Sequence, residues 1–287
     1  MNNYTKLMLL GVMEGKNIQN TPLVLTATTT GAETLTLQTL TIATGKTVVV
    51  DWGDGNTNSY TGVGTRTHAY AGAGTWAVKF TNRIDIIEID FRDTKLGGVI
   101  NGANPLPINL TYLYLNNLSG LTYNANTNPL PSKLVHLTLY IVPNFTCNAN
   151  TNPLPSGLTY IYLQNLPGLT WDINAAQPWP AGDPTVEIIN CPNVTCTAWT
   201  RNNTQSIRAE NGYNETNVDA FVNAVWANKA NFTYATPSLD LLGGYNAAPS
   251  GTYQAASPPT TGKEKIYDLV NGNYTPAGPE WTVQYQA

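Results

Sequence analysis

Charge is the scarcest feature of this 287-residue chain, because only 11% of its residues are Asp, Glu, Lys or Arg. In soluble domains the share is about a quarter. The 14 Lys and Arg residues form no cluster, which argues against nucleic acid as a partner, since phosphate binding needs a concentrated basic face. No stretch approaches the roughly 18 consecutive apolar residues of a membrane-spanning helix, so no membrane span is expected.

Cysteine and histidine are also rare, with three and two residues respectively. The sequence contains no C-x-x-C pair and no paired histidines, so neither a metal site nor a cofactor is expected. Its serines lack the G-x-S-x-G context of a nucleophile, and its glycine-rich loops lack the lysine of a phosphate-binding loop. These absences indicate that the protein is not an enzyme.

Threonine, tyrosine and valine are abundant, and they favour pleated strands. The 24 glycines and 19 prolines, together with many asparagines, supply turns. The composition therefore predicts a mainly β protein, and its 42% apolar content is enough for two domains that each bury a core.

Residues 1–20 are predicted to form an amino-terminal arm. Their apolar stretch, Leu7 to Met13, is short and lacks a small-x-small cleavage site. We interpret it as an arm that anchors or packs on a partner. A cleaved signal peptide is the alternative.

Residues 21–82 alternate between apolar and polar positions, for example over Leu23–Ala27 and Val48–Val50, as half-buried strands do. The second of these runs into Trp52-Gly53-Asp54-Gly55, and His68-Ala69-Tyr70 and Gly74-Thr75-Trp76-Ala77-Val78 follow. This order resembles the PKD-type immunoglobulin-like domain, whose hallmark is W-G-D-G, then H-x-Y, then G-T-Y/W-x-V. The resemblance implies a β-sandwich that serves as a spacer or adhesion module.

Within this sandwich, Trp52 is predicted to fill the space between the two sheets. We expect Asp51 and Asp54 to accept hydrogen bonds from turn amides, because a Ca²⁺ site would need about six or more oxygens. His68 has no Cys, Ser or carboxylate partner at useful spacing, so we expect it to make a structural hydrogen bond rather than to act in catalysis.

Residues 83–210 carry a 24-residue repeat. Leu110–Leu115, Leu134–Leu139 and Leu158–Leu163 align without a gap, and Asn-Pro-Leu-Pro precedes each. Degenerate copies extend the array to about five coils, and to seven with the segments around Ile207 and Leu239. The L-x-x-L-x-L pattern resembles the leucine-rich-repeat family, which implies a solenoid whose stacked coils bury their leucines together.

Three further columns of the repeat have structural meaning. One resembles the asparagine ladder of the same family and is broken at Ile141; it comprises Asp93, Asn117, Ile141, Asn165 and Asn190. The other columns hold the cysteines: Cys191 replaces a core hydrophobe, and Cys147 and Cys196 share the column of Tyr123 and Trp171. Two coils separate Cys147 from Cys196 by roughly 10 Å, too far for a disulfide, so three buried free thiols are predicted.

Residues 211–287 change to helical spacing between Thr216 and Phe232, and a second helix is predicted from Thr261 to Val270. A strand over Trp281–Tyr285 follows. A repeat array needs a cover over its last coil, so we interpret this region as a small α/β cap. The predicted fold class is thus mainly β, with an immunoglobulin-like β-sandwich, a leucine-rich-repeat-like solenoid and a carboxyl-terminal cap.

Residues between the core leucines are predicted to point outward in two columns. The first comprises Glu88, Tyr112, His136, Tyr160 and Glu187, and the second comprises Asp90, Tyr114, Thr138 and Tyr162. Tyrosine offers a large contact area at low entropic cost, so the columns suit stacking on sugars or packing on protein. The predicted ligand-binding residues are Tyr112, Tyr114, His136, Tyr160, Tyr162 and Glu187. The alternative is that tyrosine is simply a favourable exposed strand residue.

The string from Asn246–Gly251 to Pro258–Gly262 resembles the endings of repeat proteins from bacteriophages and from gut or environmental bacteria. The resemblance implies a non-enzymatic virion surface protein, capsid-decorating or tail-associated. Its arm would contact other virion proteins, and its solenoid would face a host-surface glycan or protein. A bacterial cell-surface or secreted adhesin is one alternative, and a glycan-active enzyme using Glu187 or Asp172 is another.

Overall fold

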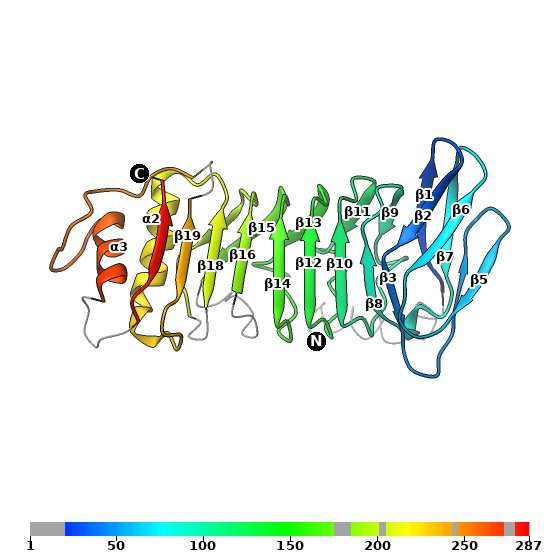
Figure 1. Ribbon diagram of the computed structural model, residues 1–287, viewed down its shortest axis with the longest axis horizontal. Helices are drawn as coiled ribbons and strands as arrows, with labels where there is room; N and C mark the ends of the chain where they lie inside the picture. Colours follow the sequence, from blue (N-terminus) through cyan, green and yellow to red (C-terminus); the bar gives the residue numbers. More distant parts are fainter. Residues whose placement is uncertain (1–20, 175–184, 201–204, 243–245, 273–278, 287) are drawn as a thin grey trace, which may run out of the picture. The chain divides into compact units, whose positions relative to one another are not determined.

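The computed structural model describes residues 21–174, 185–200, 205–242, 246–272 and 279–286. With 41% strand and 12% helix the protein is mainly β, and it contains a β-solenoid of about five turns, as the repeat predicted. The chain divides into two compact units, Met1–Leu134 and Val135–Ala287 (Figure 1). The predicted arm at residues 1–20 lies outside the described residues, and the domain boundaries expected at residues 82 and 210 stay predictions.

Seven strands open the first unit. They are β1 (Leu23–Thr29), β2 (Glu33–Leu37), β3 (Thr39–Ile42), β4 (Val48–Asp51), β5 (Thr57–Tyr60), β6 (Arg66–Tyr70) and β7 (Gly74–Phe80). Antiparallel pairing joins β1 to β7, β7 to β4 and β4 to β5, and separately joins β2 to β6. Alternate side chains of β1 and β4 are buried, as the sequence pattern predicted, whereas every side chain of β5 is at least partly exposed.

The turn after β4 is arranged around Trp52, which is fully buried as predicted. The Tyr70 hydroxyl donates a hydrogen bond of 3.0 Å to the Trp52 carbonyl oxygen. Asp51 accepts from the Gly53 amide at 2.9 Å and Asp54 accepts from the Asn56 amide at 3.1 Å, so both predicted turn contacts are confirmed. The hydrogen bond from Gly53 is the main reason why the pKa of Asp51 is lowered.

The prediction that His68 lacks a carboxylate partner is wrong. Its Nε2 lies 2.7 Å from Asp54 Oδ2, and its ring stacks on Trp52 with a centroid distance of 4.9 Å. Burial opposes ionisation of Asp54, but the hydrogen bonds from His68 and Asn56 outweigh it and lower the pKa. The two residues are 14 positions apart, one in the turn between β4 and β5 and the other in β6, so their contact could not be read from local spacing.

The remaining elements of the first unit begin the solenoid. They are the 3₁₀ turn η1 (Arg83–Asp85) and the strands β8 (Ile86–Phe91), β9 (Leu96–Ile100), β10 (Tyr112–Asn116) and β11 (Leu121–Asn124). Parallel pairing joins β8 to β10 and β9 to β11. The preceding strands extend both sheets, because β3 pairs antiparallel with β8 and β1 pairs antiparallel with β9. These antiparallel strands therefore cover the open edges of the first coil, which a repeat array requires.

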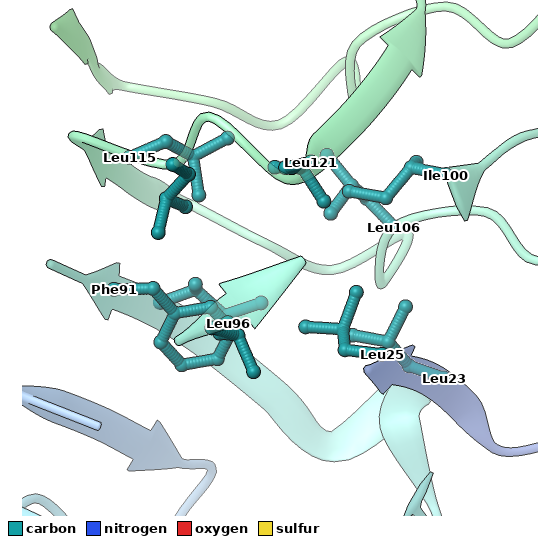
Figure 2. A pocket seen from close by; sticks show the side chains of 10 residues that line it. Leu23, Leu25, Phe91, Leu96, Ile100, Leu106, Leu115 and Leu121 are labelled. Carbon is teal, nitrogen blue, oxygen red and sulfur yellow. The ribbon is translucent and has the colours of Figure 1, made fainter. Parts of the chain in front are cut away.

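One apolar interior is common to these strands and the first coils. Figure 2 shows Leu23 and Leu25 of β1 facing the leucines and the phenylalanine that the coils contribute, among them Phe91, Leu96 and Leu115. A cavity of only about 10 Å³ is left between them, and every side chain that lines it is apolar. The coils and the antiparallel strands thus share a single packed core.

The described part of the second unit contains nine strands. They are β12 (His136–Tyr140), β13 (Asn144–Asn148), β14 (Tyr160–Gln164), β15 (Gly168–Ile173), β16 (Thr185–Ile189), β17 (Val194–Cys196), β18 (Ser206–Glu210), β19 (Ser238–Leu241) and β20 (Thr282–Tyr285). Parallel pairing orders β12, β14, β16, β18, β19 and β20 in one sheet and β13, β15 and β17 in another. Repeated coils therefore contribute two strands, whereas the sequence predicted only the first.

Two helices close the second unit, as predicted. α2 (Glu215–Ala227) has Asn214 as its N-cap, and α3 (Gly262–Asn271) has Thr261. The expected extension of the first helix to Phe232 is wrong, because a separate 3₁₀ turn, η2 (Lys229–Asn231), follows it. α2 packs on α3 and β17, and α3 packs on β20.

The three cysteines are buried and free, as predicted. Burial raises the pKa of Cys147 to about 11 and that of Cys191 to about 12, so both are thiols at neutral pH. Their predicted columns need one correction. The sheet pairs Cys147 with Leu169 and Cys196 with Ile173, so neither cysteine pairs with Trp171.

The predicted asparagine ladder has a backbone explanation that the sequence did not reveal. Asn117, Ile141, Asn165 and Asn190 all adopt positive φ, between 50° and 57°. Asparagine tolerates this left-handed conformation, whereas a β-branched side chain crowds its own backbone there. In the second unit the Asn190 side chain also donates to that of Asn165 at 2.6 Å. Ile141 therefore stores strain that its column neighbours avoid.

We expect Ile141→Asn to stabilise the protein by about 1 kcal/mol, because asparagine relieves the left-handed strain at φ 53°. Urea unfolding of the variant and the wild type would measure the gain. Ile141→Val is the matched control, since it keeps the β-branch and should show no gain. An asparagine variant that is no more stable than the wild type would mean that the apolar contacts of Ile141 outweigh its strain.

Candidate functional site

The candidate site lies on the outward face of the larger sheet in the second unit. Figure 1 shows β14, β16, β18 and β19 side by side and pointing the same way. Successive side chains of a strand point to opposite faces, so Ile161 and Leu163 of β14 are buried while Tyr160 and Tyr162 face outward. Parallel pairing in register then aligns the outward residues of neighbouring strands into rows.

Two outward rows cross the sheet perpendicular to the strands. One row passes from Tyr162 through Glu187, Arg208 and Asp240 to Gln284, each residue being the register partner of the next. We call Glu187, Arg208 and Asp240 the charged row. The parallel row, which we call the hydroxyl row, comprises Thr185, Ser206, Ser238 and Thr282.

The rows begin on an aromatic platform formed by His136, Tyr160 and Tyr162. The rings of His136 and Tyr160 stack with centroids 4.3 Å apart and an interplanar angle of 11°. Tyr160 remains 40% exposed, which leaves area for a ligand. Tyr140, which the sequence analysis did not single out, meets Tyr162 edge to face at 6.3 Å. The structure thus brings together the three aromatic residues predicted for this unit and adds a fourth.

Electrostatics couple the platform to the charged row. Partial burial is the main cause of the raised pKa of Tyr162, and the negative charge of Glu187 on the next strand raises it further. The Tyr162 hydroxyl also donates to the Gln164 side chain. Tyr162 is therefore a neutral hydrogen-bonding group at physiological pH, with its ring held beside a carboxylate.

Arg208 is the centre of the charged row. Its Nε lies 2.6 Å from Glu210 Oε1, and this hydrogen bond is the main reason why the pKa of the guanidinium is raised. Glu187 and Asp240 flank it at 3.8 and 3.9 Å. Sequence analysis missed Arg208, Glu210 and Asp240, because these residues lie beyond the regular repeats.

An open hollow of about 260 Å³ lies over this end of the sheet. Its lining draws on both rows and on Gln284, and it comprises Glu187, Ser206, Arg208, Ser238, Leu239, Asp240, Thr282 and Gln284. Leu239 is fully buried, because its side chain points to the opposite face of the sheet from Ser238 and Asp240. The surrounding groups include hydrogen-bond donors and acceptors of every common kind, so the hollow can hold a polar ligand.

Glu187 does not occupy the predicted column. Its register partner is Tyr162, so it belongs one row away from Tyr160, with which it was grouped. Asp172, the other carboxylate considered for catalysis, lies on β15 in the other sheet, where Thr195 and Thr197 donate to it. The two carboxylates therefore belong to different sheets. Among the described residues, no three His, Cys, Asp or Glu side chains are grouped as metal ligands would be.

The first unit carries the two remaining predicted binding residues on β10. Tyr112 is 45% exposed and pairs with Glu88, while Tyr114 pairs with Asp90. Arg92 lies over the Tyr114 ring, with its guanidinium carbon 4.1 Å from the centroid, and donates two hydrogen bonds to Asp90. The Arg92 guanidinium thus covers part of the Tyr114 ring through a cation–π contact, whereas Tyr112 leaves more of its side chain open to a ligand.

Comparison with known proteins adds no relative from which a function could be transferred. No helix in the described ranges combines the length and the apolar character that crossing a bilayer requires. No family model, no curated protein and no solved structure matches this chain.

Proposed function

We propose that this protein is a non-enzymatic component of a bacteriophage particle, capsid-decorating or tail-associated, that displays a face for binding a host-surface glycan or protein. The observation that carries the proposal is the aromatic platform, which continues directly into the charged row on one exposed sheet face. Flat rings beside fixed donors and acceptors suit recognition, and tyrosine provides contact area at low entropic cost. The carboxyl-terminal resemblance to phage repeat proteins supports the setting.

The proposal also assigns the two parts of the chain to two kinds of module. We propose that residues 21–82 are a PKD-type immunoglobulin-like module and that the coils belong with leucine-rich-repeat-like solenoids. The buried Trp52 and the hydrogen bond from Tyr70 to its carbonyl support the first assignment. The parallel ladders and the buried leucines of the coils support the second. In this proposal the sandwich is a spacer and the solenoid carries the ligand-binding face.

We expect the combined replacement of Tyr112, Tyr160 and Tyr162 by Ser to weaken attachment by about 100-fold, because exposed aromatic anchors dominate binding energy. Binding of the labelled protein to host cells, with the melting temperature as a check on folding, would measure it. Replacing Tyr60, Tyr234 and Tyr253 by Ser is the matched control, since it removes as many tyrosines outside the face. Equal attachment by both triple variants would refute a role for the tyrosines.

Mass spectrometry of purified particles tests the setting separately. We expect peptides of this chain at a fixed ratio to the major capsid or tail protein. Their absence from particles, combined with tyrosine-dependent attachment to cells, would instead favour a bacterial adhesin.

A further inference from the structure

The hollow on the charged and hydroxyl rows is lined by no aromatic ring, so it offers a ligand hydrogen bonds rather than stacking. It adjoins the aromatic platform through Glu187, which lies next to Tyr162 on the neighbouring strand. A ligand that stacks on Tyr160 or Tyr162 and continues along the rows passes into the hollow. The chemistry of the lining therefore indicates what the ligand is.

The charges of the hollow exclude an acidic ligand. Three carboxylates, those of Glu187, Glu210 and Asp240, surround the single guanidinium of Arg208. The carboxylates therefore outnumber the guanidinium, and the net charge of this group of side chains is negative. A ligand that carries carboxylate or phosphate would meet like charge there, which opposes association.

The remaining groups favour a ligand rich in hydroxyls. Glu187 and Asp240 lie beyond hydrogen-bond length from Arg208. Each carboxylate can accept several hydrogen bonds, so both can still accept hydrogen bonds from a ligand in the hollow. Ser206, Ser238 and Thr282 both donate and accept. Sugar hydroxyls also donate and accept, and the apolar faces of sugar rings suit the tyrosines.

The direction of the rows favours a linear polymer. The rows cross the strands, and adjacent strands lie about 4.8 Å apart. A pyranose unit in an extended chain has a similar length, so consecutive sugars can meet equivalent positions on consecutive strands. A compact ligand would use only one end of this arrangement.

We propose that the hollow is a hydrogen-bonding subsite for an uncharged linear polysaccharide, which crosses the strands with one sugar on the aromatic platform and the next sugars over Glu187, Arg208 and Asp240. This inference rests on the proposed binding function and names its ligand class. The carboxylates and hydroxyls of the two rows orient the sugars, and the platform supplies the stacking area.

Binding of the full chain to immobilised polymers tests the inference. The probes are linear galactan, glucan and mannan as neutral polymers, galacturonan as the acidic counterpart of galactan, and chitosan as a cationic polymer. We expect at least one neutral polymer to bind about tenfold more tightly than galacturonan, with little dependence on added salt. Tighter binding of either charged polymer would overturn the inference.

Ser206→Phe, which fills the hollow, should weaken binding of the neutral polymer by about tenfold. Thr170→Phe, on the exposed face of the other sheet, is the matched control and should bind normally. Unchanged binding by Ser206→Phe, together with loss in the tyrosine variant, would remove the hollow from the site and leave the proposed function intact. Tyrosine-dependent cell attachment without any polysaccharide binding would likewise overturn only this inference, whereas no attachment of any kind would overturn both.

Discussion

Replacing Asn246 by Ala should destabilise the protein by about 4 kcal/mol, because four backbone groups would lose their hydrogen-bond partner. Asn246 is buried, and its side-chain oxygen Oδ1 accepts from the backbone amides of Asn211 and Tyr213 at 3.1 and 3.0 Å. Its side-chain amide donates to the carbonyl oxygens of Ala209 and Leu241 at 2.7 and 3.1 Å. Alanine satisfies none of these groups.

The position of Asn246 explains why one side chain has this effect. Along the ladder the amides of Ile141, Asn165 and Asn190 each donate to a backbone carbonyl of the next coil. At Asn211 the acceptor is instead the side-chain carbonyl of Asn246. Asn246 thus takes the place of the backbone of the next coil and ends the ladder without an unsatisfied amide.

Urea unfolding would measure the effect of Asn246→Ala. Asn231→Ala is the matched control, because the Asn231 side chain is exposed and bonds to the side chain of Asn228 at a helical turn. We expect the control to lie within about 0.5 kcal/mol of the wild type. A similarly small effect at Asn246 would show that water replaces the side chain and that the ladder needs no such end.

The first strand of each coil could be predicted because its buried leucines recur at a constant interval. Leu113, Leu137 and Ile161 are at most 1% exposed, and only stacked coils can bury such a column. The second strands could not be predicted. In Leu121–Asn124 the buried Leu and Tyr alternate with Thr and Asn, and so short a polar segment also fits a turn.

The candidate site was predictable only as far as the period held. Tyr160 and Tyr162 lie one period from His136 and Thr138, and the register confirms that these residues pair. Beyond these residues the interval between coils changes. The sequence alignment therefore placed Glu187 in the wrong column and did not reveal that Arg208 and Asp240 belong to its row. Sheet pairing is a long-range property, and a loop of different length shifts the column without any local signal.

The sequence predicted that asparagines form the ladder, but it did not predict that these residues adopt positive φ. Asparagine at Asn117, Asn165 and Asn190 fits both a hydrogen-bonding role and a left-handed backbone. Ile141 distinguishes these two explanations, because the isoleucine side chain cannot form a hydrogen bond and the residue still has a similar positive φ. The backbone path, set by the coils on either side of it, determines the conformation of this column.

Replacing Gly53 by Ala should cost about 4 kcal/mol, much more than the same change at Gly55. Both glycines have positive φ, 84° and 93°, so alanine is strained at either position by about 1–2 kcal/mol. Only Gly53 has a further obstacle: a Cβ there would lie 2.7 Å from the Ala77 nitrogen and 2.8 Å from its carbonyl oxygen. A Cβ at Gly55 would meet nothing within 4 Å.

The obstacle at Gly53 cannot move aside cheaply. Ala77 lies in the middle of β7 and pairs with Thr26 of β1, so displacing it would break hydrogen bonds on both strands. The turn cannot retreat either, because Trp52 before it fills the core and Asp51 holds the Gly53 amide. The W-G-D-G motif therefore uses its two glycines for different reasons: the first for close approach to β7 and the second for backbone conformation alone.

Urea unfolding of Gly53→Ala and Gly55→Ala separates these reasons, because the backbone strain is common to both variants and cancels in their difference. We expect that difference to be about 2 kcal/mol or more, with Gly55→Ala still folded and able to bind. If Gly53→Ala does not fold, Gly55→Ala still reports the cost of strain alone. Equal stabilities would mean that the turn can lift away from β7, and Trp52 would then have to hold the turn to the core without the close contact at Gly53.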